Sequence, residues 1–139
     1  MFRLIELISS INVHLLRQLS PIVKTQGLSV SEMIILWKVN KKGRARIKDI
    51  AAEVGLPPST MTGIFDRLAK LEYVERLHDV EDRRSVMIQG TPQLATLVDQ
   101  ASLKAMDELE GILGSLPNGF LQRFEEDLEI MYNHLSKGN

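Results

Sequence analysis

Three hydroxyl side chains and a pair of arginines stand out between residues 59 and 84. Ser59, Thr60 and Thr62 are close together in the sequence, and Arg83 and Arg84 follow beside several carboxylates. Small hydroxyls can hydrogen-bond base edges or phosphate oxygens, and a guanidinium suits phosphate or a narrow minor groove. These residue types indicate contact with nucleic acid rather than catalysis.

Two short helices joined by a turn would position the hydroxyls. Apolar residues recur at helical spacing in both segments, at Ile47, Ile50, Ala51 and Val54 and then at Met61, Ile64, Phe65 and Leu68. Between them, Gly55 suits the left-handed end of a helix, and Pro57 and Pro58 suit the start of the next. The pattern predicts a helix-turn-helix with hydroxyls facing outward. Taken alone, Ser59 and Thr60 could equally serve only as an N-cap.

A charged hairpin is predicted directly after the second helix. Residues 74–77 and 85–89 are short runs rich in β-branched or apolar residues, and they flank a charged segment, residues 78–84. A hairpin in this position is a wing. A carboxylate at its tip can hold one of the two adjacent guanidinium groups in a fixed pose for the minor groove. The alternative is a solvated charged turn.

The motifs that combine these features lie at defined distances along the chain. They are Ile47-Lys48-Asp49-Ile50-Ala51, Ser59-Thr60-Met61-Thr62, Asp66-Arg67-Leu68, Asp79-Val80-Glu81-Asp82-Arg83-Arg84-Ser85 and Thr91. Together they resemble the multiple antibiotic resistance regulator (MarR) family of winged-helix transcription factors. The resemblance implies an obligate homodimer that binds a pseudo-palindromic operator in double-stranded DNA. It also implies a repressor that a small-molecule effector releases.

The resemblance assigns roles to individual side chains. Three would face the major groove: Ser59, Thr60 and Thr62. Asp82 would orient Arg84, whose guanidinium would enter the minor groove. Arg67 and Arg83 would contact phosphate or internal carboxylates such as Asp66.

Four residues depart from the family pattern. Gly63 stands where the family often has arginine, and Glu72 stands where a glycine usually ends the recognition helix. Gly90 and Leu94 replace a usual leucine and glycine on either side of Thr91. These departures affect the expected DNA sequence and affinity more than the expected fold.

Length and composition favour one domain without a cofactor. The chain has 139 residues, 44% of them hydrophobic, which is enough for a sizeable core in a single domain spanning residues 1–139. No apolar run is long enough to cross a membrane, and no signal peptide is evident. With no cysteine and three widely separated histidines, we expect no metal site, no cofactor and no enzymatic activity. A cytoplasmic location is the simplest expectation.

Charge is distributed unevenly along the chain. Residues 38–91 hold eleven bases and eight acids, a net charge of +3, whereas residues 92–139 hold three bases and eight acids, a net charge of −5. This asymmetry would orient the protein on a polyanion, with binding that weakens as salt rises. Within the basic part, residues 40–44 could contact phosphate, or could form a solvated helix end.

The expected fold is mainly α with a small β-hairpin wing. A winged helix-turn-helix over residues 28–91 would be combined with a helical dimerisation layer from residues 1–27 and 92–139. Residues 2–20 have a broad apolar face, and Pro21 would end or kink that helix. Ser29 with Glu32 forms a capping box, and Thr91-Pro92 opens a helix of about seven turns. A further helix with an apolar stripe follows Gly119.

The alternative function is a protein-interaction adaptor that does not bind DNA specifically. Gly63 and the near-neutral overall charge of −1 favour it. The Ser59-Thr60-Met61-Thr62 and Asp82-Arg83-Arg84 segments favour DNA binding, because an adaptor has no need of this exposed polar chemistry. The sequence identifies neither the operator nor the effector, and it does not separate repressor from activator.

Overall fold

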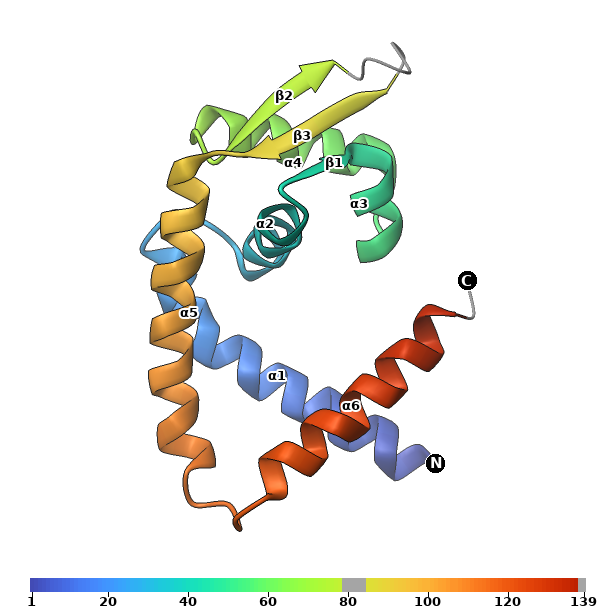
Figure 1. The fold of residues 1–139 in the computed structure, drawn as a ribbon, viewed down its shortest axis with the longest axis vertical. Coiled ribbons are helices and arrows are strands. Elements are labelled where there is room, and N and C mark those ends of the chain that lie inside the picture. The colour runs from blue at the N-terminus through green and yellow to red at the C-terminus, as the bar shows by residue number, and fades with distance from the viewer. Residues whose placement is uncertain (79–84, 138–139) are drawn as a thin grey trace. The chain divides into compact units, whose positions relative to one another are not determined.

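The computed structural model describes residues 1–78 and 85–137. Its elements follow in the order α1 (Phe2–Lys24), α2 (Val30–Lys42), β1 (Arg44–Arg46), α3 (Ile47–Val54), α4 (Pro58–Lys70), β2 (Val74–His78), β3 (Val86–Gly90), α5 (Pro92–Leu113) and α6 (Phe120–Ser136) (Figure 1). The expected class, mainly α with a small β wing, is confirmed. The chain divides into two compact units, Met1–Ala105 and Met106–Asn139.

The sheet has one strand more than the expected hairpin. Strands β2 and β3 pair antiparallel from Val74↔Gly90 to His78↔Val86. Strand β1 pairs with the other edge of β3, with Ala45 opposite Ile88, so the order is β1-β3-β2. The sequence reasoning treated residues 40–44 as a turn and missed this strand, because three residues are too few for a recognisable alternation.

Helix α1 continues through the expected break at Pro21. Proline removes one backbone donor, but the helix runs on to Lys24. Val23 in that last turn is buried, and its carbonyl accepts the N–H of Leu28 at 3.2 Å. Burial of Val23 offsets the lost hydrogen bond. Of the two expected effects of Pro21, the end of the helix is wrong, and the kink stays a prediction.

Capping at the helix ends follows the sequence closely. The hydroxyl of Ser29 accepts the N–H of Glu32, and the Glu32 carboxylate accepts the N–H of Ser29 at 2.8 Å, which confirms the capping box. Gly55 ends α3 in the left-handed conformation, with φ of 69°. The hydroxyl of Thr91 accepts the N–H of Leu94 and donates to the carbonyl of Glu72 at 2.7 Å. Thr91 therefore ties the start of α5 to the end of α4.

Helix α5 is shorter than expected. It spans 22 residues, about six turns rather than seven, and ends at Leu113. The N–H of Gly114 still donates to the carbonyl of Glu110 at 2.8 Å, but glycine lowers the helical propensity there. The chain then turns through residues 114–119 and enters α6.

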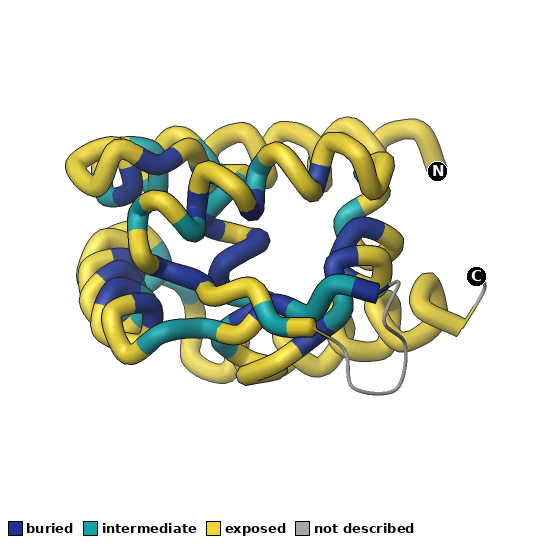
Figure 2. Tube along the Cα trace, turned by 90° about the horizontal axis from the view of Figure 1, so that it is seen from above, coloured by how far each residue is buried: buried dark blue, intermediate teal, exposed yellow. Residues whose placement is uncertain are grey.

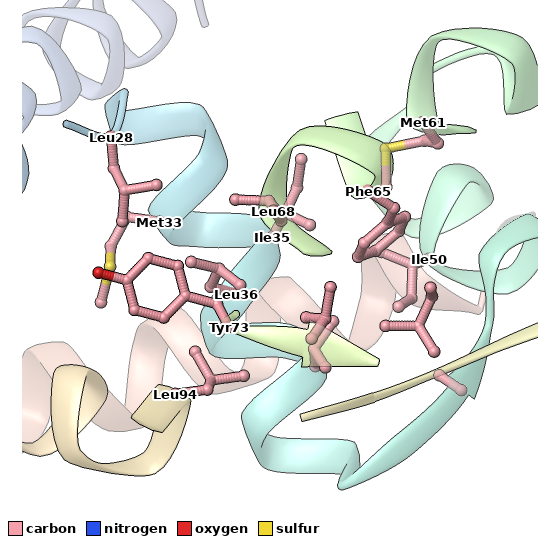
Figure 3. Packing of buried hydrophobic residues seen from close by; sticks show 14 of the residues in the cluster. Leu28, Met33, Ile35, Leu36, Ile50, Met61, Phe65, Leu68, Tyr73 and Leu94 are labelled. Atoms are coloured by element: carbon pink, nitrogen blue, oxygen red, sulfur yellow. The ribbon is translucent and has the colours of Figure 1, made fainter. Parts of the chain in front are cut away.

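One hydrophobic core lies between the helices of the first unit and the small sheet. Its largest fully buried side chains are Phe65, Met33, Ile35, Leu36, Ile50, Met61, Leu68, Ile88, Leu94 and Val39. Figure 3 shows Met61 and Phe65 of α4 beside Ile50 of α3, with Leu36 of α2 and Leu94 of α5 in the same cluster. This core holds α4 by one face and leaves the opposite face exposed.

Gly90 and Leu94 form a packed pair. A Cβ placed on Gly90 would lie 2.9 Å from Cδ2 of Leu94, and Leu94 has no exposed surface. The Leu94 side chain therefore occupies the space that a side chain at position 90 would need. Gly90 and Leu94 therefore depend on each other in this chain.

Two helices expose long apolar faces in the single chain. No residue of α6 is buried, and residues 1–15 of α1 are all exposed (Figure 2). The exposed apolar side chains of α1 include Leu4, Ile5, Leu7, Ile8 and Ile11, and those of α6 include Phe120, Phe124, Leu128, Met131 and Leu135. Soluble monomers rarely expose faces of this kind, so both helices have the composition of interface helices.

Candidate nucleic-acid interface

Helix α4 presents the predicted hydroxyls on its exposed face. Met61, Phe65 and Leu68 are buried on the other side of the helix, and this burial fixes its rotation about its own axis. All of Ser59, Thr60, Thr62, Gly63, Asp66, Arg67 and Lys70 are exposed. The helix can therefore lie against a large partner with polar side chains foremost.

The first turn of α4 separates the two interpretations of its hydroxyls. The helix begins at Pro58 with Pro57 as its N-cap, and no side chain caps it. Ser59 and Thr60 thus lie inside the first turn, and the N-cap alternative does not apply. The Thr62 hydroxyl donates to the carbonyl of Pro58 at 3.0 Å, whereas the structure shows no intramolecular partner for the other two hydroxyls in the described part of the chain.

Arg67 faces helix α2 rather than Asp66. Its guanidinium bonds the Glu32 carboxylate and donates to the carbonyl of Gly27 at 2.6 Å. About half of the Arg67 side chain stays exposed. Of the two partners expected for Arg67, an internal carboxylate or phosphate, the internal one is present, but it comes from the capping box.

Glu32 consequently serves two contacts at once. Partial burial by itself would raise the pKa of Glu32, but hydrogen bonds from the N–H and hydroxyl of Ser29, together with the Arg67 guanidinium, bring it below its ordinary value. The charged carboxylate is therefore the stable form at neutral pH. It links the start of α2 to α4.

Asp66 has a partner that sequence reasoning did not identify. Arg76 of β2 lies 2.7 Å from the Asp66 carboxylate and donates to the carbonyl of Thr62 at 3.2 Å. An arginine ten residues after an aspartate, across a helix-to-strand turn, gives no periodic signal in the sequence. The signal that could have found it is its position in the strand that follows the recognition helix.

The bases at the end of α2 divide into two groups. Lys38 and Lys42 pair with Glu53 of α3, at 3.4 Å and 2.6 Å. The hydrogen bond from Lys42, with the charge of Lys38, lowers the pKa of Glu53 despite some burial. Lys41 and Arg44 are exposed on either side of the turn at Gly43. Gly43 is the C-cap of α2 and has a positive φ of 68°. Their contact with phosphate remains a prediction.

The predicted wing-tip residues lie outside the described part of the structure. Asp82, Arg83 and Arg84 fall between the described residues 78 and 85. The flanking strands are paired up to His78↔Val86. The roles of these three side chains remain predictions.

Residues 28–86 match the family model described as MarR family. This part of the chain is similar to the MarR family. The match covers the capping box, the two helices of the motif, β1 and β2, and it ends at the first residue of β3.

Two proteins of Bacillus subtilis (strain 168) are similar to parts of this chain. The chain is 42% identical over 64 residues to the HTH-type transcriptional regulator YfiV, which covers 46% of this chain and 40% of YfiV. It is 26% identical over 89 residues to the HTH-type transcriptional repressor MdtR, covering 64% of this chain and 53% of MdtR. The chain thus matches about half the length of these relatives.

Solved MarR structures share the fold over almost the whole chain. A MarR transcriptional regulator from Methanosarcina mazei Go1 has a TM-score of 0.83 at 19% identity, covering 96% of this chain and 99% of the other. A mutant MarR from E. coli, crystallised with operator DNA, has a TM-score of 0.78 at 19% identity and covers 93% of each chain. At this identity the likeness extends the MarR fold to α1, α5 and α6.

Other kinds of site are not evident among the described residues. Within residues 1–78 and 85–137 no three His, Cys, Asp or Glu side chains gather in a way that could hold a metal ion. None of the described helices is both long and apolar enough to cross a membrane. The exposed face of α4 is the candidate site that the geometry supports best.

Proposed function

We propose that this protein is a transcriptional regulator that binds duplex DNA through α4 and the wing. The observation that carries the proposal is the exposed first turn of α4, where Ser59 and Thr60 present hydroxyls without partners among the described residues. This turn lies in the part that matches the MarR family model, and hydroxyls of this size can approach base edges in the major groove. Arg84, oriented by Asp82, would bind the adjacent minor groove, and Arg83 and Arg67 would approach phosphate.

The proposed active form is a homodimer. The exposed apolar faces of α1 and α6 support it, because each would bury its stripe against a second copy. Residues 1–27 and 92–139 would then form the dimerisation region around the winged helix at residues 28–91. Two recognition helices held about 34–36 Å apart would match a pseudo-palindromic operator.

Repression is the proposed regulatory outcome, acting in the cytoplasm. The relative MdtR is named a transcriptional repressor, which supports this direction. A small-molecule effector would release the operator by binding more tightly to the dimer conformation in which the spacing of the recognition helices does not match the operator. The change in operator affinity is limited by the difference between the effector's affinities for the two conformations. No catalytic activity is proposed.

The test is selection of binding sites from a randomised duplex pool, followed by fluorescence anisotropy at several salt concentrations. We expect a pseudo-palindrome, with affinity that falls steeply as salt rises. Absence of enrichment at low salt would favour the adaptor alternative, and a search for protein partners would follow.

A matched pair of variants tests the site itself. Replacing both Ser59 and Thr60 by alanine should weaken operator binding about tenfold, by analogy with the loss of one or two base contacts. Thr96→Ala is the control, since Thr96 is an exposed hydroxyl that bonds the carbonyl of Pro92 as Thr62 bonds that of Pro58. Equal losses for test and control would reject α4 as the reading helix.

A further inference from the structure

Arg76 of strand β2 contacts the recognition helix at two points on successive turns. Its Nη2 lies 2.7 Å from Oδ1 of Asp66 and donates to the backbone carbonyl of Thr62 at 3.2 Å. Thr62 and Asp66 are four residues apart, so one guanidinium spans one helical turn. Arg76 itself is held in the middle of β2, opposite Ile88 of β3.

The spanned turn is the part of α4 with the weakest helical propensity. Gly63 lies inside it, and glycine in a helix interior costs about 1 kcal/mol relative to alanine. A Cβ at Gly63 would meet nothing within 4 Å, so no close packing in the chain requires glycine there. The Thr62 hydroxyl is already bonded to Pro58. The Arg76 contact therefore supports a turn that its own sequence supports poorly.

Arg76 also neutralises an acid on the face proposed to meet DNA. Ser59, Gly63, Asp66 and Lys70 are spaced three or four residues apart, which places them along one side of the helix. A bare carboxylate in that row would be repelled by phosphates, whereas a carboxylate paired with arginine is not. The Asp66 side chain is 55% exposed, so this pairing takes place at the surface of the helix.

We propose that Arg76 is a positioning residue for DNA recognition. It stabilises the helical turn of α4 around Gly63, which we call the splint, and it neutralises the charge of Asp66, which we call the masking. The strand β2 and the recognition helix then present themselves to DNA as one rigid unit. The masking part rests on the proposed function, but the splint does not require DNA. The two parts are therefore tested separately.

The splint is tested by amide hydrogen exchange in the absence of DNA. Arg76→Ala should speed exchange in residues 62–67 about fivefold relative to the wild type. Adding Gly63→Ala to that variant should restore protection, because alanine supplies the missing propensity. Arg44→Ala, an exposed arginine on strand β1, is the control and should leave α4 unchanged. Equal exchange in the Arg76 and Arg44 variants would overturn the splint.

The masking is tested by a double-mutant cycle on DNA affinity. Asp66→Asn alone should change operator affinity less than about threefold, whereas in the Arg76→Ala background it should raise affinity about tenfold. Additive effects would mean that Arg76 does not mask Asp66, and would overturn this part.

Failure of DNA binding and failure of the inference give different results. In one outcome the wild type binds no duplex at low salt, Arg76→Ala still speeds amide exchange in α4, and Gly63→Ala still restores protection. That outcome would reject the proposed function and retain the splint. A wild type that binds DNA, with no exchange difference, would retain the function and reject the splint.

Discussion

At the scale of single residues, some polar groups on the exposed face of α4 have intramolecular partners and others have none among the described residues. Arg67 is held by Glu32 and the Gly27 carbonyl, and Asp66 is held by Arg76. Lys70 and the two hydroxyls of the first turn have no partner among the residues that the structure describes, so they remain available to an external partner. Base reading should therefore concentrate at the N-terminal end of the helix.

Replacement of Arg84 by alanine should lower affinity about tenfold for operators with A·T-rich flanks and less for G·C-rich flanks. The reason is that a narrow A·T-rich minor groove has the strongest negative potential, which the lost guanidinium would use. Competition binding with the two flank types measures the difference. Arg83→Ala is the control and should weaken both types alike. Unchanged affinity in the Arg84 variant would count against the wing assignment.

Replacement of Glu72 by glycine should raise the free energy of unfolding by about 0.5–1 kcal/mol. Glu72 has a φ of 62°, a conformation that costs most residues energy and glycine almost none. The carbonyl of Glu72 that accepts the hydroxyl of Thr91 belongs to the backbone, so this hydrogen bond would persist in the glycine variant. Urea unfolding measures the change. Glu75→Gly, in the exposed row of β2, should be destabilising, and a destabilised Glu72→Gly would contradict the backbone explanation.

At the scale of elements, a few polar contacts join the recognition helix to its neighbours. The capping box of α2 continues through Arg67 into α4, and the strand β2 reaches α4 through Arg76. Thr91 ties the end of α4 to the start of α5 by hydrogen bonds to the carbonyls of Glu72 and Tyr73. These polar contacts fix the position of α4 relative to α2, β2 and α5, which otherwise pack through apolar side chains.

The contact between α2 and α4 should depend on pH through Glu32. Because the pKa of Glu32 is lowered on folding, its contribution is complete above the ordinary glutamate range and is lost as the pH falls through the lowered pKa. Glu32→Gln keeps the capping geometry but removes the charge. It should cost about 0.5–1 kcal/mol at pH 7, discounted because Arg67 is half exposed, and this cost should shrink as the pH falls below the ordinary glutamate range.

Thermal unfolding of the wild type and the Glu32 variant across this range measures the effect. Glu125→Gln, on the exposed surface of α6, is the control. A cost that stays constant from pH 7 to pH 3 would show that the charge of Glu32 is not what matters.

At the scale of the whole molecule, exposed apolar surface and uneven charge point to partners on different parts of the chain. The acids are concentrated in residues 92–139 and the bases in residues 38–91. The apolar stripes of α1 and α6 lie on helices whose residues are largely exposed in one chain (Figure 2). This separation suits a protein that meets DNA with one region and a second copy with another.

Leu128→Lys should disrupt the homodimer and lower its association constant at least about a hundredfold. Leu128 belongs to the stripe of α6, and a lysine there would bury a charge at the proposed interface. Ile130→Lys is the control, because Ile130 is 69% exposed and lies two residues away on another face. Sedimentation equilibrium measures both. A wild type that remains monomeric at micromolar concentration would reject the dimer.

Much of this architecture could be predicted from the sequence because its signals are local. The helical stripes, the capping residues Ser29 and Glu32, the left-handed Gly55 and the hairpin strands all depend on neighbours within a few positions. The resemblance to the MarR family came from motifs of the same short range. The exposed face of α4 followed directly from the spacing of Met61, Phe65 and Leu68.

The features that were missed depend on contacts between distant residues. Strand β1 forms by pairing with the edge of β3 that β2 does not occupy. Helix α1 continues beyond Pro21 to Lys24, and Val23 in its last turn is buried. The partners of Arg67 and Asp66 are separated from them by 35 and ten positions, so no periodicity reports them. Such pairings become visible only when the fold is known.

The packed pair of Gly90 and Leu94 has a consequence for how such sequences diverge. A lineage moving between this arrangement and the usual leucine and glycine must change two positions, and each single change has its own cost. Leucine at both positions would place atoms on top of one another, since even a Cβ at 90 lies 2.9 Å from Leu94. Glycine at both positions would leave a cavity in the core, which also lowers the free energy of unfolding. Both intermediates are therefore less stable than either matched pair, so the two sites should vary together among descendants.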